Sequence, residues 1–216
     1  MSSYINQLLA NDKPALIYVL DPMCSWCWAF SPVYQQIKAH YPQLKHQILL
    51  GGLAPDNDEP MPESQQHYIQ GIWRNIEQRT RVSFNYDFWS ECQPRRSTYP
   101  ACRAVMVARE QSDELAGQML KGIQQAYYQQ AKNPSDLSTL QACAQQIGLS
   151  KPFFTEQMQQ LWDNSALEEE VDFVQRLGVQ GFPTLILKND QQWLALPIDY
   201  SSPDQVYSAV DSILNK

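Results

Sequence analysis

ALIYVLDPMCSWCWAF, residues 15–30, is the stretch that decides the fold of this chain. Residues 15–20 form a continuous apolar run that is too short for a helix and is bounded by prolines, which predicts a buried strand. After the Cys-x-x-Cys of Cys24 and Cys27, apolar residues recur at spacings of three and four as far as about His40, which predicts a helix. Cys24 is therefore expected where a strand passes into the N-terminus of a helix.

A second strand and a long helical block follow. The apolar run of residues 46–53 predicts the strand. From about residue 60 to residue 163, apolar residues recur at helical spacings in several stripes, and no strand pattern of similar strength interrupts them. Residues 84–89 are ambiguous and are expected to be a loop. The block is therefore expected to be a series of helices.

Mixed helix and strand patterns return after this block. Residues 165–168 (SALE) fit a capping box, which predicts the start of a helix. Two apolar runs, residues 183–187 and 193–196, are separated by turn residues, which predicts a β-hairpin. A last helix is expected from about residue 202. The chain thus alternates strands and helices on both sides of the helical block.

The composition excludes several classes of protein. Hydrophobic residues make up 44% of the chain, enough to form a folded core. The net charge of −7 provides no basic field that would attract nucleic acid or anionic lipid. The first residues lack the pattern of a secretory leader, and no apolar run approaches the roughly 20 residues needed to cross a bilayer. We therefore expect a cytoplasmic protein without nucleic-acid or membrane partners.

Of the five cysteines, only Cys24 and Cys27 form a motif. A redox pair needs its first sulfur at a helix N-terminus, where free backbone N–H groups and the helix dipole stabilise a thiolate. A zinc site needs a second pair of ligands, and Cys92 and Cys102 lie too far apart in a helical region to serve well. The context therefore favours redox chemistry over metal binding. Cys92 and Cys102 are expected to be free thiols, and Cys143 a buried, inert one.

These features resemble a known family. The strand, the Cys-x-x-Cys, a helix with a proline eight positions after Cys24, a second strand and the later GVQGFPT of Gly178–Thr184 are similar to a thioredoxin fold. The long helical block between the second and third strands resembles the DsbA family. The motif DPMCSWCW, residues 21–28, is most similar to the cytoplasmic FrnE-type predicted protein-disulfide isomerases.

The resemblance implies an α/β, thioredoxin-like fold with a central mixed sheet and a large all-helical insertion. The thioredoxin-like domain is expected in residues 1–58 and 164–216, and the inserted helical domain in residues 59–163. The implied activity is that of a thiol–disulfide oxidoreductase or protein-disulfide isomerase acting on protein or small-molecule thiols and disulfides. Glutathione or a dithiol protein is implied as electron donor, and no bound cofactor or metal is expected.

The resemblance also implies roles for individual residues. Cys24 matches the exposed nucleophile, and Cys27 matches the partner that resolves a mixed disulfide. Pro183 matches a cis-proline beside the two sulfurs, and Phe182 before it matches the position that contacts substrate. Trp26 is expected to be exposed, as part of an apolar surface on which substrate lands.

Two positions distinguish this chain from many thioredoxin-fold enzymes. Tyr18 stands where those enzymes carry a buried acid, and Asp21, three positions before the first cysteine, is the nearest acid. The dipeptide between the cysteines lacks the histidine of the most oxidising family members. We therefore expect a couple that is less oxidising than periplasmic DsbA, whose potential is about −120 mV. Trp28 is expected in the core.

Two other functions are compatible with the sequence. The first is a glutathione-dependent transferase or isomerase of the kappa-class kind, in which the helical block would hold glutathione and an apolar substrate. That branch generally dispenses with the second cysteine, so the presence of Cys27 counts against it. The second is a zinc-stabilised or chaperone-like binding module without enzymatic activity.

Overall fold

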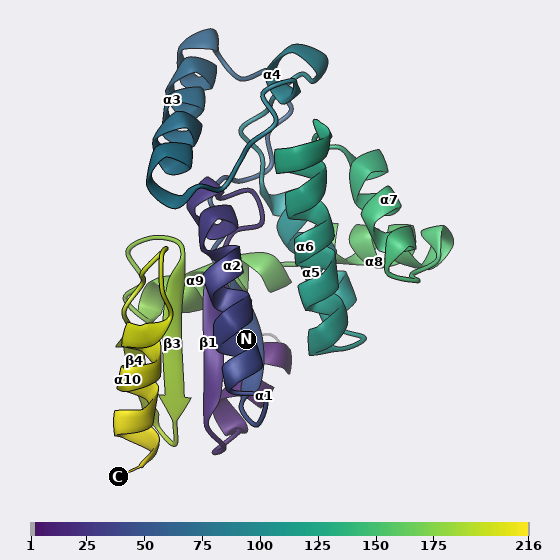
Figure 1. The fold of residues 1–216 in the computed structure, drawn as a ribbon. Coiled ribbons are helices and arrows are strands. Elements are labelled where there is room, and N and C mark those ends of the chain that lie inside the picture. Colours follow the sequence, from purple (N-terminus) through teal and green to yellow (C-terminus); the bar gives the residue numbers. More distant parts are fainter. Residues whose placement is uncertain (1–2, 216) are drawn as a thin grey trace.

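The computed structural model describes residues 3–215, in which four strands form one mixed sheet (Figure 1). The strands are β1 (Ala15–Leu20), β2 (Lys45–Leu50), β3 (Thr184–Asn189) and β4 (Gln192–Leu196). Their order is β2-β1-β3-β4, with β1 parallel to β2 and the other pairs antiparallel. The expected mixed sheet is confirmed, although β2 is shorter than predicted. It ends before Gly51 and Gly52, and Gly52 has a positive φ of 62°.

Helices cover both faces of the sheet and bury all six residues of β1 (Figure 1). The covering helices are α1 (Ser3–Ala10), α2 (Ser25–His40), α9 (Ala166–Arg176) and α10 (Asp204–Leu214). Helices α2 and α10 belong to the apolar cluster that contains Tyr18 and Leu20, α1 belongs to the cluster that contains Ile17 and Val19, and α9 contributes to both. This division follows from the alternation of side chains along a strand.

The chain between β2 and α9 forms the expected helical insertion. Its helices are α3 (Glu63–Thr80), α4 (Phe88–Glu91), α5 (Tyr99–Arg109), α6 (Asp113–Gln130), α7 (Leu137–Gln146) and α8 (Lys151–Trp162). Helix α6 packs against β2, and α7 and α8 pack against α5 (Figure 1). Within residues 3–215, no helix has both the length and the apolar character needed to cross a membrane. The boundaries of the two expected domains stay a prediction. The expected thioredoxin-like domain also includes residues 1, 2 and 216, which lie outside the described residues.

Two local predictions are wrong. Residues 88 and 89, expected in a loop, begin the short helix α4. The capping box expected at the start of α9 does not form, because the Asn164 side-chain oxygen instead accepts the Ala166 N–H at 2.8 Å. The Glu168 carboxylate, which would complete the box, accepts a hydrogen bond from Arg103 at 3.4 Å.

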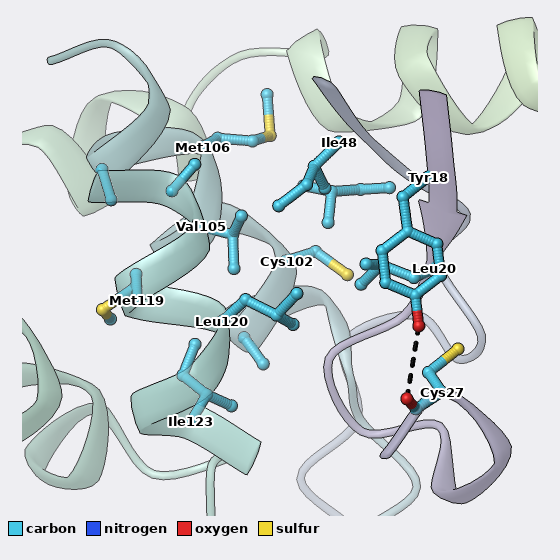
Figure 2. Close-up of a cluster of buried hydrophobic side chains, with 14 of the residues drawn as sticks. Tyr18, Leu20, Cys27, Ile48, Cys102, Val105, Met106, Met119, Leu120 and Ile123 are labelled. Carbon is cyan, nitrogen blue, oxygen red and sulfur yellow. Dashed lines mark hydrogen bonds between the residues drawn. The ribbon is translucent and has the colours of Figure 1, made fainter. Parts of the chain in front are cut away.

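One apolar core runs from the sheet into the insertion (Figure 2). Figure 2 shows Cys102 between the strand residue Leu20 and the α5 residue Val105. On the sheet side, the Tyr18 hydroxyl donates a hydrogen bond to the Cys27 carbonyl oxygen at 3.2 Å. The first turn of α2 is therefore fixed to β1, and the insertion packs directly behind it.

A buried ion pair covers the free edge of β2. Arg109 of α5 donates to the Ile48 carbonyl at 2.9 Å and to the Glu170 carboxylate of α9 at 2.8 Å. The same carboxylate accepts the Leu50 N–H at 2.8 Å. The Arg109 and Glu170 side chains are 4% and 0% exposed. The pair satisfies backbone groups that no neighbouring strand reaches, and it joins the insertion to the sheet.

We predict that Glu170→Gln lowers the free energy of unfolding by about 3–5 kcal/mol, because it leaves the Arg109 charge buried without its counter-charge. Urea denaturation measures this loss. The matched control is Glu114→Gln, which removes an exposed ion pair with Lys38 and should cost less than about 1 kcal/mol. Equal losses in the two variants would contradict the assigned role of the buried pair.

Candidate active site

The Cys-x-x-Cys lies where β1 passes into α2, as predicted. Cys24 is the N-cap of α2 with extended backbone angles, φ −81° and ψ 117°. Its carbonyl oxygen accepts the N–H groups of Cys27 at 3.0 Å and Trp28 at 3.1 Å, which begins the helix. The Cys24 thiol lies close enough to Cys27 to influence the pKa of its thiol, and both cysteines are free thiols. The geometry therefore places two sulfurs together at the positive end of the helix dipole.

The two thiols differ in their surroundings. Cys27 is fully buried, and burial raises the pKa of its thiol well above the ordinary value. The neighbouring Cys24 thiol raises the Cys27 pKa further, whereas the backbone N–H of Asp21 opposes the shift. Cys24, expected to be exposed, is only 8% exposed. That expectation is wrong, because the Phe182 carbonyl oxygen packs against one side of the thiol and leaves only the side toward a neighbouring cavity open.

The Phe182-Pro183 peptide bond is cis, as expected, and lies beside Cys24. The Cys24 thiol faces the Phe182 carbonyl oxygen, with 3.7 Å between sulfur and oxygen. Pro183 is buried immediately before β3, and Phe182 is half-buried. The Phe182 ring packs over Gly51, where a Cβ atom would lie 1.9 Å from a ring carbon. Only glycine at position 51 leaves room for this ring.

Asp21 ties three segments of the chain together around the cysteine loop. One carboxylate oxygen accepts the Met23 N–H at 2.8 Å. The other accepts the Leu53 N–H at 2.7 Å and the Thr98 hydroxyl at 2.6 Å. Burial raises the pKa of Asp21, and these hydrogen bonds partly oppose the shift. The carboxylate thereby fixes the loop before Cys24 to the exit of β2 and to the start of α5.

Among the described residues, none of the other three cysteines, Cys92, Cys102 and Cys143, forms a disulfide or a hydrogen bond with Cys24 or Cys27. Cys102 is buried, and its thiol donates to the Asp21 carboxylate at 3.6 Å. Cys92 is half-buried, and its thiol donates to the Ala131 carbonyl at 3.1 Å. Cys143 is buried, and burial raises the pKa of all three thiols. Within residues 3–215, no three His, Cys, Asp or Glu side chains are grouped so as to hold a metal ion.

A cavity of about 580 Å³ opens beside Cys24. Cys24, Trp26 and Phe182 line it, whereas Cys27 and Pro183 do not. Trp26, expected to be exposed, is half-buried because its ring packs on Tyr200 with the centroids 5.0 Å apart. The three lining residues are thus brought together, and the cavity gives a ligand access to one of the two sulfurs.

Trp28 also differs from its expected place in the core. It is half-buried, its ring stacks on Tyr128 with the centroids 5.6 Å apart, and its N–H donates to the Ser83 carbonyl at 3.3 Å. It does not line the cavity beside Cys24. Trp28 therefore connects α2 to the insertion.

The wall that α3 contributes was not predicted as part of the site. Ile69 and Ile72, which fit the apolar stripe of a packed helix, are half-buried and line the cavity. Tyr68 lines it too and is 70% exposed. Tyr68 extends the apolar stripe of this helix beyond the residues that pack in the core. An apolar face of this extra width is the sequence feature that could have indicated a binding surface on α3.

The sequence matches one protein-family model and several curated proteins. The family model described as a DSBA-like thioredoxin domain matches residues 15–206. The ClpXP adapter protein SpxH of Bacillus subtilis is 27% identical over 196 residues, covering 88% of this chain and 64% of the adapter. The chain spans 62–64% of the length of the curated relatives that it matches.

Solved structures show the same fold. A candidate protein disulfide isomerase from Nitrosomonas europaea has a TM-score of 0.78 at 24% identity, covering 94% of this chain and 98% of that one. The cytosolic disulfide reductase DsbM from Pseudomonas aeruginosa has a TM-score of 0.75 at 24% identity, covering 93% and 98%. DsbM has also been solved with GSH, and this structure has a TM-score of 0.73 at 23% identity, covering 94% of this chain and 100% of that one.

We predict that iodoacetamide at neutral pH modifies Cys24 faster than any other cysteine, because Cys24 lies at a helix N-terminus and lines the cavity. Cys27 and Cys102 should stay unmodified in the folded protein, since their buried thiols have raised pKa values. Peptide mass spectrometry after brief labelling measures the order, and labelling in urea is the control. Equal rates at Cys24 and Cys92 would contradict the site.

Proposed function

The chain belongs to the DsbA-like thioredoxin family, and from this premise we propose that it is a thiol–disulfide oxidoreductase that uses Cys24 and Cys27 as its redox pair. The observation that carries the proposal is the placement of the two free thiols one helical turn apart at the N-terminus of α2, with Cys24 lining a cavity and Cys27 fully buried. Two cysteines one helical turn apart lie within the reach of a disulfide bond.

The proposed reaction has two steps of thiol–disulfide exchange. The Cys24 thiolate attacks a substrate disulfide, forms a mixed disulfide and releases the first substrate thiolate, which takes up a proton. The Cys27 thiol then loses its proton and attacks the Cys24 sulfur, which releases the second substrate thiolate. The protein ends as a Cys24–Cys27 disulfide, oxidised by two electrons, and the substrate is reduced by two. A dithiol or two molecules of a monothiol returns the electrons.

The burial of Cys27 suits its role in the second of these two reaction steps. A thiol whose pKa is raised stays protonated and does not compete for incoming disulfides. Once Cys24 is in a mixed disulfide, one contribution that raises the Cys27 pKa, the neighbouring Cys24 thiol, is gone. Trp26 and Phe182 line the cavity, and we assign them to contact with the substrate.

The direction of the reaction and its partners are part of the proposal. DsbM is described as a cytosolic disulfide reductase and has been solved with GSH, which supports a cytoplasmic reductase or isomerase with glutathione or a dithiol protein as electron donor. The curated relatives are described as ClpXP adapter proteins, which supports a protein partner as well. We propose protein or small-molecule thiols and disulfides as the substrates.

We predict that Cys27→Ser accumulates a mixed disulfide with glutathione at Cys24, because the attacking sulfur remains and the resolving one is absent. Intact-mass spectrometry after exposure to glutathione disulfide measures the adduct. Cys24→Ser should form none at the motif, and Cys143→Ser, a control outside the site, should behave as the wild type. Full turnover by Cys27→Ser with glutathione alone would instead support the monothiol, kappa-class reading.

A further inference from the structure

The cavity beside Cys24 carries only positive formal charge. Arg95 and Arg96 line it, and none of the described residues in its wall is an Asp, a Glu or a Lys. This is notable in a chain whose net charge is −7. We propose that the low-molecular-weight thiol or disulfide that reacts at Cys24 is an anion, and that Arg96 binds its carboxylate. The inference rests on the proposed function and deepens it by naming the substrate's charge and its anchor.

The two arginines differ in what they contact. The Arg95 guanidinium is already occupied, since it donates to the Asp136 carboxylate and, at 2.8 Å, to the Ser135 carbonyl. Arg96 is half-buried, yet no carboxylate within residues 3–215 pairs with it and its guanidinium makes no hydrogen bond there. The Arg96 nitrogens are not among the buried, unpaired polar atoms of the structure, so a ligand in the cavity can reach them, and a planar guanidinium without a partner can bind a carboxylate through a bidentate pair.

Arg96 is positioned relative to the nucleophile by the hydrogen bonds around Asp21. It lies two residues before Thr98, whose hydroxyl bonds to Asp21, and Asp21 in turn holds the Met23 N–H next to Cys24. Its charge also acts on Tyr127, another residue of the cavity wall. The segments that carry Arg96 and the Cys24 sulfur are thus joined through the Asp21 carboxylate.

The rest of the wall fits a small peptide-like molecule. Three glutamines, Gln65, Gln175 and Gln180, come from different segments of the wall and offer amide donors and acceptors. Ile69 and Ile72 supply an apolar side. The volume of about 580 Å³ lies within the range typical of small-ligand sites. A thiol that carries a carboxylate and amide groups therefore matches the wall in charge, polarity and size.

The test compares two disulfides as oxidants of the reduced full-length protein: glutathione disulfide, which is anionic, and bis(2-hydroxyethyl) disulfide, which is uncharged. The readout is the ratio of the two second-order rates of Cys24–Cys27 oxidation. Arg96→Ala should lower the ratio of the rate with the anionic disulfide to the rate with the neutral one by about 10- to 100-fold. This factor corresponds to the loss of one hydrogen-bonded charge pair. Arg96→Lys should restore part of it, because the charge returns without the planar fork.

Arg74→Ala is the matched control, since Arg74 is exposed on α3 and does not line the cavity, and its ratio should equal that of the wild type. The neutral disulfide also reports whether the cysteine site is intact in each variant. An unchanged ratio in Arg96→Ala, or an equal fall in Arg74→Ala, overturns the assignment of Arg96 while leaving the proposed function in place. Failure of the wild type to react with either disulfide overturns the proposed function itself.

Discussion

The buried carboxylate of Asp21 is the constraint on which the site depends. A carboxylate that is withdrawn from water needs hydrogen-bond donors, and Asp21 takes them from Met23, Leu53 and Thr98. These donors belong to the cysteine loop, the exit of β2 and the start of α5. The Thr98 hydroxyl also lies 3.3 Å from the Ala54 carbonyl. It can therefore donate there and accept from Asp21 when that carboxyl, whose pKa is raised by burial, is protonated.

In the proposed reaction, the two neighbouring thiols have separate tasks. Cys24 lines the cavity, and so do Trp26, Phe182 and the proposed anion-binding residue Arg96. Cys27 is buried against the sheet, where the Tyr18 hydroxyl holds its carbonyl. The Arg109–Glu170 pair holds the insertion against β2. It thereby fixes the position of the insertion relative to the sheet, and both contribute walls to the cavity.

The sequence predicted those features whose cause is local. Residues 15–20 were predicted with their observed bounds because a strand covered on both faces is apolar throughout. Helix α8 was not distinguished within the block, although Ser150 caps it by accepting the Phe153 N–H. Helix α1 was not predicted, because eight residues carry too short a pattern. The low exposure of Cys24 and the place of Arg96 depend on segments far apart in the chain, and no local pattern records such contacts.

The most direct test of the central claim is the reduction potential of the wild-type protein in glutathione redox buffers, with the disulfide located by peptide mapping. The account predicts a single reversible two-electron transition that forms the Cys24–Cys27 disulfide, at a potential lower than the about −120 mV of DsbA. A transition that links Cys92 or Cys102, or the absence of any reversible transition, would contradict it.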